Sequence, residues 1–471
     1  MRENSSLIEA AREFPNKLPD ILKKSYRLEG AEHIDKILLS VLVTLIKNNE
    51  FEKIQKILPK LIKIISKFSG IQYAYNLLSR IEVSFGFRKP SIGIYDHTFH
   101  LIGGGQKYGC TIAYALQKDF DITLISNKRV SLEDLKKWYD LDLSNCKIKV
   151  IRLPFFEERG FNEIDPGMVT FRMENPFHII SRETGNYDIF INNSMLEMVY
   201  PLSNISILIC HFPERRRANY FYADKYDYII YNSKYTGEWI KKKWKVNPTT
   251  HIYPPVDMLD SEEKPVKEDI ILSVARFEIG GSKQQFEMIK AFIDLEKRYS
   301  ENLKNWRLIL SGGSIKNNPY LNKIENFLSS LQNNKIELKV NISIDELKDL
   351  YKKAKIFWHF CGLNQTDPSM IEHFGMSIVE AMQNWCVPIV FDGGGQREIV
   401  EDGISGYRFS NLRELKAKTM KLIRDENLLN KLSEGAFKRG KDFTKEMFIS
   451  KIKSFFSEIL NSYTKIQCSP S

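Results

Sequence analysis

The chain has 471 residues, which fits two to four domains because an ordinary domain spans roughly 100–200 residues. Hydrophobic residues make up 43% and charged residues 27%, so a disordered or collagen-like chain is excluded. The net charge of +10 favours anionic partners, but no finger spacing, basic zipper or basic–aromatic run points to nucleic acid. We therefore expect a globular protein of several domains that does not bind nucleic acid.

The sequence also bears on the compartment. No apolar stretch reaches the roughly 18–20 residues that a membrane span needs, and the first residues lack the basic-then-apolar order of a secretion signal. The cysteines are scattered without a C-x-x-C pair, which argues against a disulfide framework and against a cysteine zinc site. We expect a cytoplasmic protein, with a peripheral position on the cytoplasmic face of a membrane as the open alternative.

Residues 1–88 have a helical pattern and no convincing strand. Between Lys47 and Phe68, apolar residues recur at three-and-four spacing, lysines occupy the other faces, and Pro59 must kink or split the helix. Two interpretations of the lysines stay open. They form either the solvated face of a helical bundle or a basic amphipathic surface that rests on anionic lipid.

From Pro90 onward, short apolar runs alternate with helical patterns. Such near-continuous runs are typical of strands buried on both faces of a parallel sheet. The first series covers residues 91–96, 121–127, 146–153, 187–194, 205–212 and 226–233, with a helical pattern at 106–117. Pro254 and Pro255 interrupt it, and residues 261–269 form a polar linker. We expect a first Rossmann-like domain at 89–258.

A second series of the same kind follows. Strand-like runs lie at 269–276, 306–313, 336–340, 355–360 and 387–392, and helical patterns lie at 283–299, 318–331, 343–354 and 375–384. The fold class is therefore α/β, with two doubly wound domains that face a cleft and a second domain at 259–443. Residues 444–471 are expected to form a C-terminal helix that packs back on the first domain.

Two segments carry features that suit an anion. LIGGGQKYG places Gly104 and Gly105 at a strand–turn–helix junction, where backbone can approach a phosphate closely, although a plain tight turn explains it as well. In the second domain, Arg276 follows a strand and Lys283 begins the next helical pattern. Strand ends face the cleft in this fold, so the two cations could converge on an anion, or they could be ordinary surface cations.

The segment IEHFGMSIVEAM is the most informative. Glu372 precedes a helix that is expected to open near Gly375 or Met376, and Glu380 lies about 6–7 Å further along its axis. Exposed amides at this helix start provide a seat for an anion, with one carboxylate on each side. Among the histidines, His211 ends an apolar strand and should face the cleft. His97, His100, His359 and His373 are further cleft candidates, without a zinc-ligand spacing beside a carboxylate.

With these residues the chain resembles the retaining nucleotide-sugar glycosyltransferases of family 4, which have the two-domain GT-B fold. The similar segments keep the family's order over about residues 90–445: Gly104–Gly105, CHFP, YNSKYT, IYPPVD, SVARF with Lys283, EHFGMSIVEAM and GGGQREIVEDGISGY. They are most similar to bacterial polysaccharide-assembly members and to eukaryotic mannosyltransferases that extend lipid-linked oligosaccharides. Residues 1–88 match nothing in the family core.

The resemblance implies a role for each residue. Glu372 would hold the hydroxyls of the transferred sugar, and the backbone of His373, Phe374, Gly375 and Met376 would bind sugar and diphosphate. Glu380 would accept hydrogen bonds from ribose, and Arg276 and Lys283 would neutralise the diphosphate. His211 would touch the sugar from the first, acceptor-side domain, and Gly104 and Gly105 would admit the phosphates. The family usually places its lysine five residues after the arginine, whereas the gap is seven here.

These roles predict a retaining hexosyltransferase that needs no metal and no cofactor, because two cations and a helix N-terminus can stabilise the departing diphosphate. The expected donor is GDP-mannose or a UDP-hexose, bound by the second domain, and the expected acceptor is a glycan or a lipid-linked saccharide. A sugar phosphorylase, a nucleotide-sugar epimerase and a non-catalytic partner subunit are the alternatives.

Overall fold

A computed structural model describes residues 76–464, except 77, 78, 81, 85, 161–163, 171–172, 214–219, 258–261 and 332–333. Most of the predicted helical region at 1–88 therefore lies outside the described residues, as do both interpretations of its lysines. No helix in the described ranges is both long enough and apolar enough to cross a membrane.

The first domain is built on a seven-stranded parallel sheet with the order β3-β2-β1-β4-β5-β6-β7. Its central strands are apolar and buried on both faces: all residues of β4 and β5 are buried. The strands are β1 (Ser91–Tyr95), β2 (Asp121–Ser126), β3 (Lys147–Val150), β4 (Ile189–Asn192), β5 (Ile205–Cys210), β6 (Tyr228–Tyr231) and β7 (Thr250–His251). The helices are α6 (Gly104–Leu116), α7 (Leu132–Tyr139), α8 (Pro154–Glu158), α9 (His178–Thr184) and α10 (Lys234–Trp239).

The second domain has a six-stranded parallel sheet with the order β10-β9-β8-β11-β12-β13. Its strands are β8 (Glu268–Val274), β9 (Arg307–Gly312), β10 (Ile336–Val340), β11 (Ala354–His359), β12 (Val387–Phe391) and β13 (Tyr407–Phe409). The helices are α11 (Gln285–Arg298), α12 (Pro319–Leu331), α13 (Ile344–Lys353), α14 (Met376–Gln383), α15 (Gln396–Ile399), α16 (Leu412–Arg424) and α17 (Glu426–Gly440). Two doubly wound parallel domains confirm the predicted fold class.

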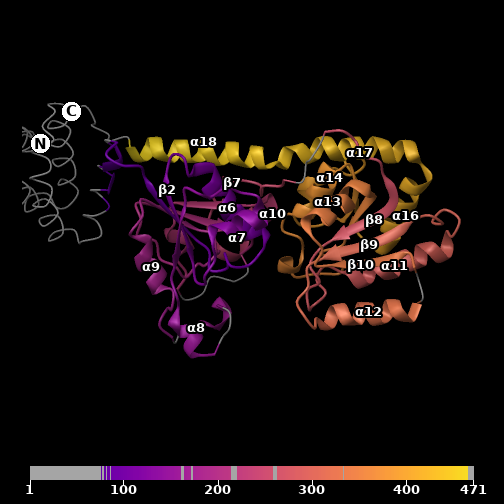
Figure 1. The fold of residues 1–471 in the computed structure, drawn as a ribbon, viewed down its shortest axis with the longest axis horizontal. Coiled ribbons are helices and arrows are strands. Elements are labelled where there is room, and N and C mark those ends of the chain that lie inside the picture. Colours follow the sequence, from indigo (N-terminus) through magenta and orange to yellow (C-terminus); the bar gives the residue numbers. More distant parts are fainter. Residues whose placement is uncertain are drawn as a thin grey trace, which may run out of the picture.

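The chain passes between the domains twice, and the two crossings lie side by side. On the first crossing, Val256 forms a parallel bridge with Thr444 of the second, and Lys445 pairs with Asp257. After the second crossing, α18 (Lys445–Thr464) runs along the first domain, shown in yellow in Figure 1. Its buried face packs on α6 and joins the apolar core around β1, β2, β4 and β5.

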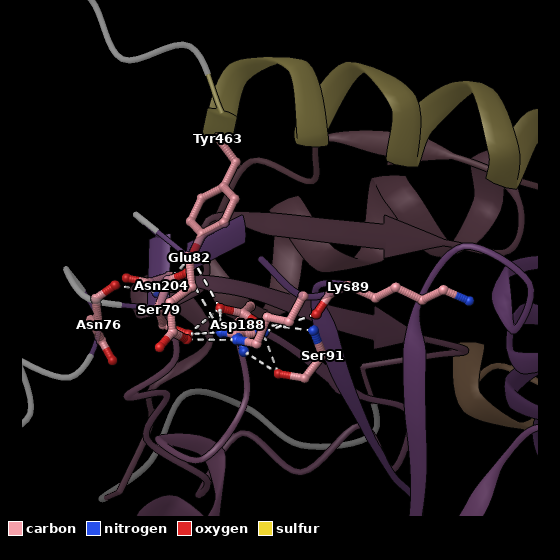
Figure 2. A network of polar contacts seen from close by, with 9 residues as sticks. Asn76, Ser79, Glu82, Lys89, Ser91, Asp188, Asn204 and Tyr463 are labelled. Atoms are coloured by element: carbon pink, nitrogen blue, oxygen red, sulfur yellow. Dashed lines mark hydrogen bonds and ion pairs between the residues drawn. The ribbon is translucent and has the colours of Figure 1, made fainter. Parts of the chain in front are cut away.

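A buried carboxylate ties three separate segments of the first domain together (Figure 2). Asp188, just before β4, is fully buried and receives both Nη atoms of Arg88 at 2.6 and 2.9 Å. It also accepts from the Ser91 amide at 2.7 Å and from the Tyr463 hydroxyl at 3.2 Å, and Ser79 donates to it as well. The start of β1, the segment before it and the end of α18 therefore share one anionic centre.

Candidate functional site

The loop between β11 and α14 carries the carboxylate that the sequence singled out. Glu372 lies in this loop, and α14 begins at Met376 with Gly375 as its N-cap, which confirms the expected helix start. Gly375 has φ +107°, and a Cβ there would meet Ile378 Cδ1 at 2.6 Å, so only glycine fits. The amides of Ile378 and Val379 donate to Gly375 O, whereas those of Met376 and Ser377 have no described backbone partner and point toward the N-terminal end of α14.

Glu372 is held between two nitrogen donors. Its Oε2 lies 2.9 Å from Lys283 Nζ and 3.0 Å from His359 Nε2, the last residue of β11. Burial would raise the pKa of Glu372, but the Lys283 charge and the His359 hydrogen bond outweigh it and hold the pKa well below its usual range. Because an ionised carboxylate only accepts, His359 donates from Nε2. Its buried Nδ1 has no hydrogen-bond partner in the described part of the chain.

Lys283 lies just before α11 and reaches a second group at the same place. Its Nζ is 3.5 Å from Cys361 Sγ, and burial raises the pKa of that thiol to about 12. Burial opposes the charge of Lys283, yet Glu372 raises the pKa of the ammonium, so both partners of this pair are ionised. Atoms of His359, Cys361 and Glu372 lie within 4.8 Å of one another, a grouping that could hold a metal ion. The Lys283 ammonium already contacts two of the three.

Arg276 is not brought to this cluster. Its side chain is 73% exposed, and its Nη2 lies 3.2 Å from Glu278 Oε1. The expected convergence of Arg276 and Lys283 is therefore absent from the described contacts, because each cation is paired with a different carboxylate. An exposed ion pair of this kind contributes only about 0–1 kcal/mol, so the Arg276 side chain can turn at little cost.

Glu380 lies one turn into α14 on the same side of the second domain. Its Oε2 accepts a hydrogen bond of 2.7 Å from the hydroxyl of Tyr351, which is fully buried. This bond orients the carboxylate and leaves its other oxygen without a described hydrogen bond. Lys107 of α6 lies close enough for the Glu380 charge to act on it, although burial lowers the pKa of Lys107 overall.

The glycine turn of the first domain faces this helix start. A Cβ on Gly104 would lie 2.9 Å from Met376 Sδ, and one on Gly105 would lie 3.3 Å from His211 Nε2. Asn193 fixes the turn by donating to Gly105 O at 2.9 Å. The absence of a side chain at both glycines thus lets the first domain approach α14 and lets His211 fit beneath the turn.

His211 and His373 meet the domain boundary from opposite sides. The Nε2 atom of His211 is buried without a hydrogen-bond partner among the described residues, and burial lowers its pKa to about 4. The His373 ring stacks on Phe212 of the first domain, with centroids 4.0 Å apart and planes 3° apart. Burial also lowers the pKa of His373 to about 4, so both imidazoles are neutral at pH 7. Phe374, the next residue, is buried in the second domain's core.

Sequence reasoning gave no role to several residues of this site. They are Lys107, Phe212, Cys361 and Glu398, whereas His359 is predicted only as a further cleft candidate. His359 had a detectable signal, since it ends a parallel strand, where side chains face the ligand side of the sheet. The contact of Cys361 with Lys283 had none, because a single buried cysteine has no spacing pattern.

The match to a protein family lies in the second domain. Residues 257–439 match the family model described as Glycosyl transferases group 1. A GDP-Man:Man(3)GlcNAc(2)-PP-Dol alpha-1,2-mannosyltransferase of Mus musculus is 32% identical over 188 residues, 36% of this chain and 35% of that protein. An uncharacterised glycosyltransferase of Methanocaldococcus jannaschii is 31% identical over 157 residues, 33% of this chain and 41% of that protein. The chain thus spans about a third of the length of the mannosyltransferase that it matches.

Solved structures resemble the whole two-domain body. Anabaena HepE in complex with UDP and glucose has a TM-score of 0.59 at 16% identity and covers 79% of this chain and 100% of its own. A glycosyltransferase from Rickettsia africae has a TM-score of 0.59 at 17% identity, covering 81% of this chain and 100% of its own. The two domains therefore have the GT-B fold, and the second of them matches the glycosyl transferases group 1 family.

Proposed function

We propose that the protein is a retaining glycosyltransferase of the family 4 type, which moves a hexose from a nucleoside-diphosphate sugar to a hydroxyl of a glycan or lipid-linked acceptor, without a metal ion or cofactor. One observation carries the proposal. The ionised Glu372 is held by Lys283 and His359 beside the start of α14; in the other domain Gly104 faces Met376 of that helix and His211 lies against Gly105. The site thus has contributions from both halves of a GT-B fold.

The geometry suits the charges of the reaction. Cleavage of the bond between the anomeric carbon and the diphosphate leaves negative charge on phosphate and positive charge on the sugar. The first amides of α14 and the Lys283 ammonium would stabilise the phosphate, and Arg276 would turn inward from Glu278. Glu372, kept ionised, would hold sugar hydroxyls and stabilise the developing positive charge. Glu380 would use its remaining oxygen for ribose.

Retention would follow from delivery of the acceptor hydroxyl on the face from which phosphate leaves. The acceptor proton would pass to a departing phosphate oxygen, so the site needs no carboxylate nucleophile. His211 and the backbone of Gly104 and Gly105 would close the sugar side and exclude water, which limits hydrolysis of the donor. His211 is neutral at pH 7 and can therefore hydrogen-bond a sugar hydroxyl without repelling the cationic sugar.

The relatives suggest the donors to be tested. The mouse relative uses GDP-Man by its name, and HepE was solved with UDP and glucose. We propose GDP-mannose or a UDP-hexose as the donor. The cognate nucleoside diphosphate should raise the melting temperature in proportion to the logarithm of its concentration, since it binds only the folded protein. Contact of residues 1–88 with an anionic membrane surface and a cytoplasmic location stay predictions.

A transfer assay tests the proposal. With the donor that gives the larger thermal shift, we expect a glycosylated acceptor of unchanged anomeric configuration, also in the presence of EDTA. Glu372→Ala and Arg276→Ala should each lower kcat by about 10²–10³ with the fold intact. The control is Glu325→Gln, which removes an exposed carboxylate from α12. Release of sugar-1-phosphate, appearance of an epimer, absence of any product, or near-normal transfer by both site variants would refute the proposal.

A further inference from the structure

Glu398 of the second domain makes contacts that cross the domain boundary. It lies in α15, and its two carboxylate oxygens accept from the backbone amides of Tyr235 at 2.8 Å and Lys234 at 2.9 Å. These amides form the first turn of α10 in the first domain. The hydroxyl of Tyr253, in the first crossing between the domains, donates to the same carboxylate at 3.0 Å. One side chain thus joins both domains and the segment that connects them.

On the first-domain side, these contacts continue to the site. Ser233, the N-cap of α10, accepts from the Thr236 amide, and the Thr236 hydroxyl donates to His211 O at 3.0 Å. The start of α10 therefore fixes the position and direction of the backbone at His211. Tyr235 also donates its hydroxyl to Pro368 O at 3.0 Å, in the loop that leads to Glu372.

On the second-domain side, the segment that carries Glu398 rests against the backbone of Glu372. The Gly395 amide donates to Glu372 O at 2.9 Å, and a Cβ on Gly395 would lie 2.2 Å from His373 O. This hydrogen bond and close backbone packing fix the start of α15 directly to the Glu372 loop. Glu398 consequently lies on a short path between the two residues that would flank the transferred sugar.

We infer that Glu398 is a positioning residue for the proposed transfer: it holds the His211 half and the Glu372 half of the site in the register that the reaction needs. This inference rests on the proposed function, but the contact itself does not. Charge-assisted hydrogen bonds to a carboxylate are roughly twice as strong as neutral ones, and two of them at a helix start also gain from the helix dipole. A misplacement of about 1 Å between reacting groups can cost about 10²-fold in rate.

Three variants separate this role from general stability. Glu398→Ala removes both acceptor oxygens, whereas Glu398→Gln keeps one. Glu401→Gln is the matched control, because Glu401 is three residues further, is 51% exposed and pairs with Arg439 of its own domain. Each variant is made in the full chain, and its melting temperature is recorded.

The first measurement is residue-resolved hydrogen exchange, which needs no substrate. We expect exchange at the Lys234 and Tyr235 amides to be about tenfold faster in Glu398→Ala, with a smaller change in Glu398→Gln and none in Glu401→Gln. The Thr236 amide is the internal reference, since it is bonded to Ser233 and not to Glu398. Equal protection of Lys234 and Tyr235 in all four proteins would overturn the inference at the level of the contact.

The second measurement is transfer with the nucleotide sugar that the wild type uses. We expect kcat to fall at least about tenfold in Glu398→Ala and less in Glu398→Gln. The Kd of the free nucleoside diphosphate should stay within about twofold, because the groups proposed to hold its charge and its ribose (Lys283, Arg276, Glu380 and the first amides of α14) lie in the second domain. An unchanged kcat, a parallel loss of nucleotide affinity, or an equal loss in Glu401→Gln would overturn the positioning role. If the wild type transfers no sugar, the proposed function fails. The exchange result still decides whether Glu398 accepts the hydrogen bonds of the Lys234 and Tyr235 amides in solution.

Discussion

At the scale of single residues, the burial of His211 links the site to the stability of the fold. Its imidazole lies beneath the glycine turn and meets the Tyr108 ring edge-on, with centroids 5.3 Å apart. Asp96 is the charged group that favours its protonation, but burial dominates and the folded-state pKa is about 4. In the unfolded chain the pKa returns to about 6.5.

The consequence is a loss of stability on mild acidification. Between pH 6.5 and 4 the unfolded chain binds more protons than the folded one at this site, so the free energy of unfolding rises with pH. The contribution is fully present above pH 6.5. We expect His211 to account for a loss of about 2 kcal/mol between pH 7.5 and 5, measured by urea unfolding. His211→Gln should flatten the pH dependence by that amount, and an unchanged slope would show that His211 has the same pKa in the folded and unfolded states.

Individual residues were only partly predictable from sequence. Glu372 could be placed because it directly precedes a glycine and a helical pattern, which are local features. Its partner Lys283 is 89 residues away along the chain, and the pair exists only because the segments that follow the neighbouring central strands β8 and β11 meet at the carboxyl ends of these strands. Arg276 shows the same limit, since nothing in the sequence predicts its pairing with the neighbouring Glu278 in preference to a shared anion site.

At the scale of elements, one arrangement of hydrogen bonds between an aspartate and a serine recurs in the first sheet. Asp188, just before β4, accepts from the amide and hydroxyl of Ser91 at the start of β1, and the Asp188 amide donates back to the Ser91 hydroxyl. Asp227, just before β6, makes the same three hydrogen bonds with Ser206 in β5. The two arrangements differ in burial, because Asp188 is fully buried and bound to Arg88, whereas Asp227 is exposed.

This pair offers a matched test of the buried network. Asp188→Ala removes the buried partner of the Arg88 guanidinium, which keeps its ion pair with the more exposed Glu82, and we expect a loss of about 3 kcal/mol in the free energy of unfolding. Asp227→Ala removes the same serine contacts in water, and we expect a loss of about 1 kcal/mol. Urea unfolding at pH 7 measures both losses. Equal losses would mean that the serine contacts, and not the Arg88 ion pair, account for the effect.

The elements themselves were largely predictable. The central strands β1, β4, β5, β8, β11 and β12 are rich in apolar residues, so their burial is visible in the sequence, and α11 to α14 follow from three-and-four spacing. Strands β3 and β10 were also predicted, although lysines and a glutamate interrupt them and most of their residues are not buried. Strands β7 and β13 were missed because two or three residues at a sheet edge produce no periodic signal. Helix α10 was missed for a related reason: it is six residues long and continues into a π-helical turn at Ile240–Trp244. The helices α7, α8, α9, α15, α16 and α17 were not predicted either.

At the scale of the whole molecule, the last helix follows the second domain in sequence but completes the core of the first. Phe448, Ile452 and Phe456 of α18 are buried in the first domain's core, and Phe456 meets Phe120 edge-on at 5.8 Å. The end of α18 is fixed by the Tyr463 hydroxyl at Asp188. The domains are therefore connected by two crossings that lie side by side. The second crossing leads into α18, which is part of the first domain's core.

This arrangement predicts which domain is destabilised when the packing of α18 is weakened. Phe456→Ala removes a ring that is 1% exposed and should cost about 3–5 kcal/mol, whereas Met447→Ala, at a residue 45% exposed on the same helix, should cost less than about 0.5 kcal/mol. Because the ring packs on the first domain, hydrogen exchange should accelerate in β1 and β2 and stay near normal in β8 and β9. Equal acceleration in both sheets would show that the two domains unfold as one unit. The crossings would then transmit the loss of packing across the boundary that Glu398 spans.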